Sequence, residues 1–324
     1  MKRREFITGI SAIMAWPFVA RAQMKTTPAI GFLSGRSRTE TVAVMGQFHN
    51  GLAEAGFVEG QNLRVEYRWA DGRYDRLPTL AAELVALRPT MIVATGGNVA
   101  ALAAKAATST IPIVFAAGGD PIKGGLVASL NRPGGNVTGV SLFIAELAAK
   151  RLEFLREIAP QSTAIGVLVN PDNPTGVAEA HDVEARATAL GLSVRLFNVR
   201  GANEMEQAFA GVAQGRIQAI LVTNDPFLID LKDQLVQIAA ALPIIYFTRD
   251  FVEAGGLMSY GASIGDGYHK VGIYAGQILM GARPADLPVQ QPTKFELVIN
   301  LHAVKALGLE IPPTLLARVD EVIE

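Results

Sequence analysis

The chain has 324 residues, with no cysteine and only four histidines. Without cysteine it can form no disulfide and carry no lipid on a cysteine side chain, and an oxidising compartment would cause no mispairing. The histidines, at positions 49, 181, 269 and 302, stand apart, so the sequence offers no helical pair of the kind that holds a metal ion. We therefore expect neither a metal nor another cofactor.

Strong charge of one sign and long apolar runs are also missing. Charged residues make up 18% of the chain, the formal net charge is −1, and 50% of the residues are hydrophobic. Nucleic acids and anionic membrane surfaces attract clustered Lys and Arg, so we expect neither as a partner. Beyond the N-terminal segment no apolar run reaches the ~18 uncharged residues that a stable membrane insertion needs. The composition is typical of well-packed globular proteins, and the length suits about two domains of ~150 residues.

Motifs that carry catalysis are equally hard to find. The sequence has no Gly-x-Ser-x-Gly nucleophile elbow and no phosphate loop ending in Gly-Lys-Ser or Gly-Lys-Thr. The segment from Gly31 to Gly35 lacks the third glycine of a dinucleotide fingerprint. We expect no enzyme, although acid pairs assembled from distant residues leave an α/β enzyme acting on a small polar metabolite as the alternative.

The N-terminal segment has the features of an export signal. A basic start with Arg3 and Arg4 precedes an apolar stretch over residues 7–20, and small residues flank Arg21 before a predicted cleavage after Ala22. Paired arginines followed by Glu-Phe-Ile are similar to a twin-arginine signal, and an ordinary secretory signal is the alternative. Removal of residues 1–22 changes the formal net charge from −1 to −4, because four basic residues and one acidic residue leave with it: Lys2, Arg3, Arg4, Arg21 and Glu5. We expect a periplasmic protein.

Short apolar runs alternate with amphipathic segments through the rest of the chain, in two similar halves. The first half has expected strands at residues 28–34, 62–69, 91–95, 111–116 and 136–143, and expected helices at 39–56, 77–87, 99–107 and 147–158. The second half has expected strands at 164–169, 193–199, 219–223, 244–247 and 257–261, with helices at 177–190, 204–212 and 228–241. A helix at 266–280, a strand at 294–299 and a short helix at 303–307 complete the chain. This alternation predicts an α/β fold with two doubly wound parallel-sheet lobes.

The stretch that begins at Met91 is the clearest local signal. The apolar run to Thr95 predicts a strand buried on both faces, and an alanine-rich helix follows the turn Gly96-Gly97-Asn98. Glycines let the backbone approach a ligand, and the free N–H groups at a helix start suit an anion or a carboxylate. A tight strand-to-helix turn without a ligand is the alternative.

Polar residues recur where the other expected strands end. Ligands of open parallel sheets bind beyond the carboxyl ends of the strands, so two facing sheets would line one cleft from both sides. The residues at these ends are small, amide, hydroxyl or carboxylate groups together with two tyrosines: Ser34, Thr95, Gly96, Gly97, Asn98, Ala117, Asp120, Asn170, Asp172, Asn224, Asp225, Tyr246 and Tyr260. Such a set can hydrogen-bond a small polar molecule and cover its apolar part with aromatic faces.

Ordinary structural roles compete with this interpretation. Asp120, Asn173 and Asp225 each precede a proline, and helix capping, worth ~1 kcal/mol, would explain all three. Tyr246 and Tyr260 could be core tyrosines whose hydroxyls find partners. The recurrence of polar groups on one predicted face of two sheets favours ligand binding over these separate explanations.

The most specific run of the chain lies at residues 120–141 and reads DPIKGGLVASLNRPGGNVTGVS. Two further segments stand out at residues 51–62 and 282–309, the latter with Ile299-Asn300-Leu301 and Ala306-Leu307-Gly308. The three segments resemble a family of ABC-transporter substrate-binding proteins that includes tryptophan and tyrosine binders. The resemblance covers almost the whole chain after the export signal.

The resemblance implies a type I periplasmic-binding fold, in which two α/β lobes joined by three crossings close on a solute. Lobe 1 would comprise residues 28–141 and about 262–288, and lobe 2 residues 142–261 and about 289–324. Hinge crossings would lie near Ser141, Ala262 and Pro288. Such proteins are not enzymes, need no cofactor, and hand their solute to the permease subunits of an ABC transporter.

The resemblance also implies a ligand site between the lobes. Loops of the first lobe at Ser34, Thr95–Asn98 and Ala117 would face loops of the second lobe at Asn170, Asp172, Asn224 and Asp225. For an amino acid, the ligand carboxylate would lie at the helix start near Gly97 and the ammonium would face Asp225 or Asp172. An aromatic carboxylate or another small acid would fit the site nearly as well. A different class of protein, a sensor whose ligand-binding lobes signal to a partner, would have the same cleft.

Overall fold

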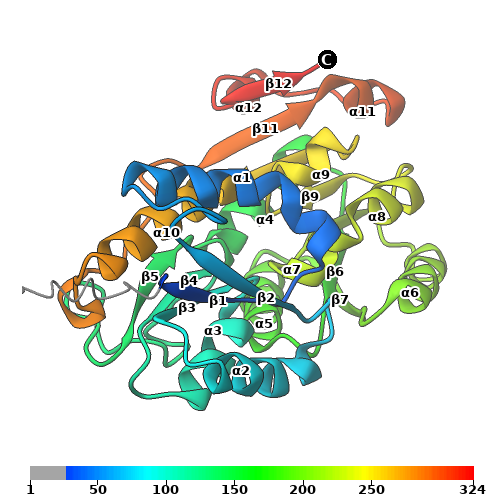
Figure 1. Ribbon diagram of the computed structural model, residues 1–324. Coiled ribbons are helices and arrows are strands. Elements are labelled where there is room, and N and C mark those ends of the chain that lie inside the picture. Colours follow the sequence, from blue (N-terminus) through cyan, green and yellow to red (C-terminus); the bar gives the residue numbers. More distant parts are fainter. Residues whose placement is uncertain (1–26) are drawn as a thin grey trace, which may run out of the picture.

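Two β-sheets organise the computed structural model, which describes residues 27–324. The predicted export signal at residues 1–22 lies outside the described residues. One sheet has five strands and the other has seven, and helices cover both of them (Figure 1). The predicted α/β class with two sheet-based lobes is confirmed.

The five-stranded sheet is parallel throughout and has the order β2-β1-β3-β4-β5. Its strands are β1 (Ala29–Ser34), β2 (Arg64–Trp69), β3 (Met91–Thr95), β4 (Ile113–Ala117) and β5 (Val137–Ser141). All five residues of the central strand β3 are buried, as its apolar run predicts. Met91 and Val93 belong to one apolar core and Ile92 and Ala94 to another, because alternate residues of a strand face opposite sides of the sheet.

Helices from distant parts of the chain cover the two faces of this sheet. On one face lie α1 (Arg38–Glu54) and α10 (Ile264–Leu279), and on the other lie α2 (Leu77–Ala86) and α3 (Asn98–Ala107) (Figure 1). The short 3₁₀ turn η1 (Tyr74–Arg76) precedes α2. Since α10 follows five of the seven strands of the second sheet in the sequence, the chain returns there to complete the helix layer on the first sheet.

Glycines set the distance between α1 and α10. A Cβ atom on Gly51 would lie 2.1 Å from the carbonyl oxygen of His269, and one on Gly272 would lie 2.2 Å from that of Phe48. Real Cβ atoms do not approach backbone atoms this closely, so any larger residue would push the helices apart. The two helices therefore meet backbone to backbone.

The seven-stranded sheet has the order β12-β11-β10-β9-β8-β6-β7. Its strands are β6 (Ala164–Val169), β7 (Ser193–Asn198), β8 (Ala219–Val222), β9 (Ile244–Tyr246), β10 (Met258–Gly261), β11 (Glu296–Asn300) and β12 (Glu321–Ile323). The expectation of purely parallel pairing is wrong at one place, because β10 and β11 are antiparallel. The chain enters β11 from the other lobe, without a helical crossover from β10, so the connection that enforces parallel pairing is absent there.

The helices of this half are α4 (Ala148–Ile158), α5 (Pro174–Ala189), α6 (Ala202–Gln214), α7 (Pro226–Asp230), α8 (Lys232–Ile238), α9 (Asp250–Glu253), α11 (Leu301–Ala306) and α12 (Pro313–Leu316). Two further 3₁₀ turns are η2 (Ala145–Leu147) and η3 (Pro284–Asp286). The single helix expected over residues 228–241 is instead divided into α7 and α8 at Leu231, whose backbone leaves the helical region at φ −104° and ψ 13°. The division follows Asp230, which bonds to the other lobe.

Three segments connect the parts built on the two sheets. They lie between β5 and α4, between β10 and α10, and between α10 and β11. The first and third run together, because Ser141 N–H donates to the carbonyl of Gln290 and Gln290 N–H donates to that of Gly139, each at 2.9 Å. The two sheets are therefore joined along one side of the molecule.

Candidate functional site

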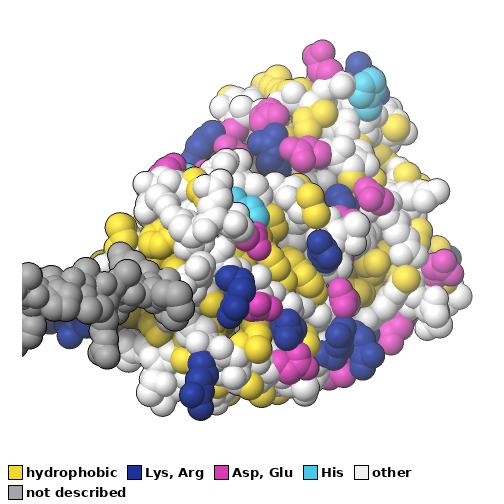
Figure 2. Space-filling model, viewed as in Figure 1, with side chains coloured by type: hydrophobic (Ala, Val, Ile, Leu, Met, Phe, Trp, Pro, Cys, Tyr) yellow, Lys and Arg dark blue, Asp and Glu magenta, His cyan; other side chains and the backbone are white. Residues whose placement is uncertain are grey.

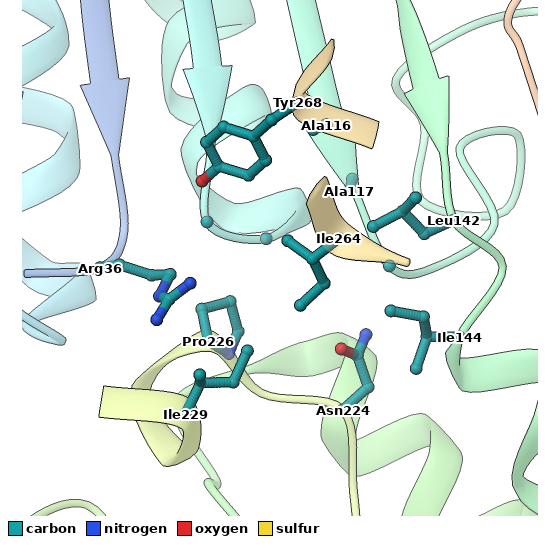
Figure 3. A pocket seen from close by; sticks show the side chains of 13 residues that line it. Arg36, Ala116, Ala117, Leu142, Ile144, Asn224, Pro226, Ile229, Ile264 and Tyr268 are labelled. Atoms are coloured by element: carbon teal, nitrogen blue, oxygen red, sulfur yellow. The ribbon is translucent and has the colours of Figure 1, made fainter. Parts of the chain in front are cut away.

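A cavity lies where strand ends from the two sheets meet (Figure 3). The space between its walls is about 410 Å³ with the open solvent at its mouth included, and the centres of water molecules can occupy about 40 Å³ of it. The residues that line it come from both sheet layers and from α10: Arg36, Gly96, Gly97, Ala116, Ala117, Gly118, Leu142, Ile144, Asn224, Pro226, Ile229, Ile264 and Tyr268. Most of these side chains are small or aliphatic, so the cavity is apolar with a few polar groups.

The five-stranded sheet contributes tight glycine turns. Gly96 and Gly97 have φ angles of 72° and 98°, a backbone region that favours glycine. A Cβ on Gly35 would lie 2.3 Å from the carbonyl oxygen of Gly96, so the loops after β1 and β3 pack backbone to backbone. Gly97 is the N-cap of α3 and provides no side-chain cap, which leaves the first N–H groups of that helix without a side-chain acceptor.

The second lobe approaches these turns closely. A Cβ on Gly118 would lie 2.2 Å from Nδ2 of Asn224, so this glycine makes room for an amide from the opposite side of the cavity. Asn224 N–H donates to the buried carboxylate of Glu179 at 2.8 Å, which fixes the Asn224 backbone. The Asn224 side chain is thereby held at the boundary between the lobes.

Arg36 brings the only side chain in the cavity lining that is charged at neutral pH. Its exposed fraction is 3%. Its Nε donates to Asp230 of α7 at 3.0 Å and its Nη2 donates to the carbonyl of Glu40 at 3.0 Å. Ser37 N–H donates to the other carboxylate oxygen of Asp230 at 2.7 Å. Burial raises the pKa of Asp230 above its ordinary value, while Arg36 and the Ser37 N–H act against that rise.

Two buried hydroxyl groups lie close to each other at this end of the cavity. Tyr268 lines the cavity and is 2% exposed, and Thr95, at the end of β3, is fully buried. Within residues 27–324, neither the Tyr268 hydroxyl nor Thr95 Oγ1 forms a hydrogen bond of normal geometry. Thr95 is nevertheless close enough to Tyr268 to act against the rise in the pKa of its hydroxyl. Burial raises the pKa of Tyr268, so its hydroxyl keeps its proton and can donate a hydrogen bond.

Asp225 has a capping role. Its Oδ1 accepts from Phe227 N–H at 2.8 Å and from Leu228 N–H at 3.3 Å, as the N-cap of α7. Oδ1 also accepts from the Tyr74 hydroxyl at 3.1 Å, across the lobes, and Oδ2 accepts from Asn173 Nδ2 at 2.8 Å. Burial raises the pKa of the Asp225 carboxyl to about 6, against the effect of these donors. Asp225 thus caps α7 behind the cavity lining, and its contact with a ligand ammonium stays a prediction.

The structure brings some of the predicted site residues together. Gly96, Gly97, Ala117 and Asn224 line the cavity. Four more are buried next to it or behind its lining: Ser34, Thr95, Asn170 and Asp225. Asn98 accepts from Gly119 N–H at 3.2 Å and, with Asp120, lines a neighbouring crevice between α3 and α5.

The other predicted residues lie elsewhere. Asp172 is on the surface, where its carboxylate is 3.4 Å from Arg200 Nε. Tyr246 stacks on Phe251 with ring centroids 4.5 Å apart, inside the second lobe. Tyr260 packs edge-on against Phe154 at 5.0 Å. None of the three lines the cavity, and both tyrosines have the packing role that was the alternative at the sequence level.

Sequence reasoning missed two of the three side chains in the cavity lining that carry polar groups, Arg36 and Tyr268. Arg36 could have been found, since it follows the strand-end pair Ser34-Gly35. Tyr268 could not, because α10 comes more than 160 residues after β3 in the sequence and no local pattern relates the two.

The described part of the chain offers little that would indicate a metal centre or a membrane anchor. Residues 27–324 contain no group of three or more His, Asp or Glu side chains placed to hold a metal ion. Among the helices of that part, none is both long and apolar enough to cross a bilayer. On the face shown in Figure 2, basic and acidic side chains are interspersed.

Comparisons with known proteins agree on one family. A family model described as ABC transporter substrate binding protein matches residues 29–323. A tyrosine-binding protein of Clostridioides difficile (strain R20291) is 28% identical over 269 residues, which cover 81% of this chain and 76% of that protein.

Solved structures show the same fold. The ABC domain in complex with L-Trp from Streptococcus pneumonia has 29% identity and a TM-score of 0.81, and the match covers 92% of this chain and 100% of that one. The ligand-free, open structure of CD0873 from Clostridium difficile has 27% identity and a TM-score of 0.64, with 91% and 99% covered. A leucine binding protein LivK from Thermotoga maritima, at 15% identity and a TM-score of 0.55 over 81% of this chain and 78% of that one, shares the fold alone. The predicted type I periplasmic-binding fold is confirmed.

Proposed function

Because the chain belongs to the ABC transporter substrate binding protein family, we propose that it is the exported solute-binding component of an ABC importer. Its solute is a small molecule with a carboxylate and an apolar, aromatic part: an aromatic amino acid or an aromatic or small carboxylate. The chain has no catalytic activity of its own, and an α/β enzyme is the alternative. The observation that carries the proposal is the cavity lined from both sheet layers at the carboxyl ends of their strands.

Capture works by closure of two lobes. Lobe 1 comprises residues 28–141 and about 262–288, and lobe 2 comprises residues 142–261 and about 289–324. The crossings near Ser141, Ala262 and Pro288 act as the hinge. A ligand shifts such a protein towards the closed form through contacts that exist only when the lobes meet. The higher TM-score with the L-Trp complex than with the ligand-free open structure supports a closed arrangement here.

The solute contacts both lobes. From lobe 1 the backbone at Gly96, Gly97 and Ala117 forms one wall, with Thr95 behind it, and from lobe 2 Asn224 forms the opposite wall. The aromatic part lies among Leu142, Ile144, Ile264 and Ile229, which supply an apolar surface without a fixed hydrogen-bond pattern. The names of the tyrosine-binding and L-Trp-bound relatives support an aromatic solute.

Export and delivery complete the proposal. Residues 1–22 direct the chain out of the cytoplasm and are removed after Ala22, and the twin-arginine route is the proposed one. The protein then works in the periplasm and passes its solute to the permease subunits of its transporter. Fusing residues 1–22 to a reporter, with a control in which Arg3 and Arg4 are replaced by lysine, tests the route.

A thermal-shift screen of residues 23–324 against aromatic amino acids, aromatic carboxylates and small dicarboxylates tests the function. A bound solute raises the melting temperature in proportion to the logarithm of its concentration, once that exceeds Kd. Hits are incubated with the protein for hours and recovered. Unchanged solute supports a binding protein, whereas conversion to a product would establish the enzyme alternative.

A further inference from the structure

We propose that the solute is an aromatic or similarly apolar carboxylate that carries no α-ammonium group. Its carboxylate lies at the end of the cavity formed by Arg36 and Tyr268, and its apolar part lies against Leu142 and Ile144. This inference rests on the proposed function of solute capture and narrows its substrate class.

The cavity has a cation available for a carboxylate. Of the 13 lining residues, Arg36 alone is charged at neutral pH. Its Nε and Nη2 are engaged by Asp230 and by the carbonyl of Glu40, while Nη1 forms no hydrogen bond within residues 27–324. A guanidinium with a free N–H group is a strong donor to carboxylates, more so where water is excluded.

An ammonium group, by contrast, finds no carboxylate among the 13 residues that line the cavity, and the carboxylates nearby already accept bonds from protein donors. The Asp230 oxygens each accept a bond, one from Arg36 and one from Ser37 N–H. Asp225, behind the lining, accepts four bonds from protein donors. Glu179 is paired with Arg151 and accepts from Asn224 N–H. An α-ammonium in this cavity would thus be buried beside the Arg36 cation with no carboxylate in the lining to accept its hydrogen bonds, which is unfavourable.

The unpartnered hydroxyls point to the same arrangement. Buried hydroxyl groups normally have a partner, and those of Tyr268 and Thr95 have none within the described residues. Figure 3 shows the Tyr268 hydroxyl on the side of the cavity where Arg36 lies, with Leu142 and Ile144 on the other side. The uncapped start of α3 at Gly97 adds N–H donors at the polar end. A carboxylate in the cavity would accept from the Tyr268 hydroxyl and from these N–H groups together, while Thr95 lies behind the lining.

Matched ligand pairs test the inference directly. Calorimetry at pH 7 with residues 23–324 compares 3-phenylpropanoate with L-phenylalanine, 3-(4-hydroxyphenyl)propanoate with L-tyrosine, and 3-(indol-3-yl)propanoate with L-tryptophan. The members of each pair differ only in the α-ammonium. In the pair whose ring fits, we expect the acid without the amine to bind at least ~10-fold more tightly. Its neutral amide should also bind at least ~10-fold more weakly than the acid, because it lacks the charge that Arg36 recognises.

Variants connect this preference to the named groups. Tyr268→Phe removes a hydroxyl that has no protein partner, so the affinity for the acid should fall about 3- to 10-fold while the melting temperature of the free protein does not decrease. Tyr246→Phe is the control, since it changes another buried tyrosine remote from the cavity and should leave affinity unchanged. Arg36→Gln should abolish the preference for acid over amide. Lys232→Gln, which removes a different ion pair between the lobes, should keep it.

The outcomes separate the two proposals. If an amino acid binds more tightly than its partner without the amine, the inference is overturned and solute capture stands. The same holds if Tyr268→Phe and Arg36→Gln bind the acid as the natural protein does. If no member of the three pairs binds, the proposed capture of an aromatic solute fails and this inference fails with it.

Discussion

Two buried arginine–carboxylate pairs of similar chemistry have different positions in this molecule. Arg151 and Glu179 lie on α4 and α5 of the same lobe, and both side chains are fully buried. Arg36 and Asp230 lie on different lobes, with Nε and Oδ1 3.0 Å apart and exposed side-chain fractions of 4% and 10%. Burial raises the pKa of both carboxyls, and the arginine acts in the opposite direction in each pair.

Their neighbours explain what each pair does. Arg151 Nη1 also donates to the carbonyl of Ile144 at 2.9 Å and lies 3.4 Å from that of Tyr260, next to two of the three crossings between the lobes. Under the proposed closure, this pair would hold the crossings and stay intact when the lobes move. The Arg36–Asp230 pair joins the two lobes, so the proposed opening would separate it. The comparison teaches that similar chemistry joins two helices of one lobe in one place and two lobes in the other.

Breaking the pair at the hinge should have the largest effect. Arg151→Met leaves the Glu179 carboxylate buried without its cation, so we expect the free energy of unfolding to fall by ~3–5 kcal/mol. Urea denaturation measures the change. Arg156→Met, an exposed position on the same helix, is the control and should change it by less than about 0.5 kcal/mol. Equal effects of the two substitutions would contradict a special contribution of the Arg151–Glu179 pair to stability.

Asp225 sharpens the comparison, because this buried carboxylate has amide and hydroxyl donors but no cation among the hydrogen-bond partners described here. Burial raises its pKa from 3.8 to about 6, so the folded state holds the proton more strongly than the unfolded state. The stabilisation from this group is complete below about pH 4 and is lost as the pH rises to about 6. Relative to Asp225→Asn, the natural protein should lose up to ~3 kcal/mol of unfolding free energy across that window, measured by urea denaturation at several pH values. A constant difference between the two proteins would contradict this pH dependence.

The pair between the lobes should affect closure more than folding. Asp230→Asn removes the charge that Arg36 faces, so we expect the closed form to lose ~1–2 kcal/mol relative to the open form, with little change in unfolding free energy. Small-angle X-ray scattering of the ligand-free protein should then give a larger radius of gyration. Asp233→Asn, an exposed neighbour with a side chain 79% accessible, is the control. A radius unchanged by Asp230→Asn would mean that the pair does not hold the lobes together.

The second ion pair across the lobes, between Lys232 and Glu40, should matter least. Both side chains are partly exposed, at 22% and 29%, so solvent screens their attraction. We expect Lys232→Gln to shift closure by ~0.2–1 kcal/mol at low salt and by nothing measurable at 1 M salt. The scattering profile at both salt concentrations measures this. A large effect that persists at 1 M salt would mean that the Lys232–Glu40 pair stabilises the closed form as the Arg36–Asp230 pair does.

Local patterns in the sequence were sufficient for most of the fold. The apolar run from Met91 to Thr95 and its following glycines predict β3, its turn and α3, because buried strands and helix starts depend on nearby residues. The family was predicted from the run at residues 120–141 and is confirmed. The reversed direction of β11 was missed, since it depends on where the chain re-enters the lobe.

The cavity was predicted less completely. Its glycine turns and Asn224 follow strand ends, so the position rule for parallel sheets found them. Asp172 and Tyr246 obey the same rule, yet one side chain turns to Arg200 at the surface and the other stacks within the lobe. Strand ends specify a region, whereas the direction of a side chain depends on tertiary neighbours that the sequence pattern does not contain. Tyr268 lies within helix α10, so a rule about strand ends could not have found it.

The glycine-to-glycine contact between α1 and α10 has a consequence for biosynthesis. Phe48 and Leu52 of α1 and Tyr274 and Ile278 of α10 share one apolar core with β1 and β3. A ribosome that has made only residues 1–260 has produced all five strands of the first sheet and α1, but not α10, which covers the same face together with α1. Nascent chains of that length leave part of this apolar face exposed, because the first lobe can reach its native form only after α10 has emerged.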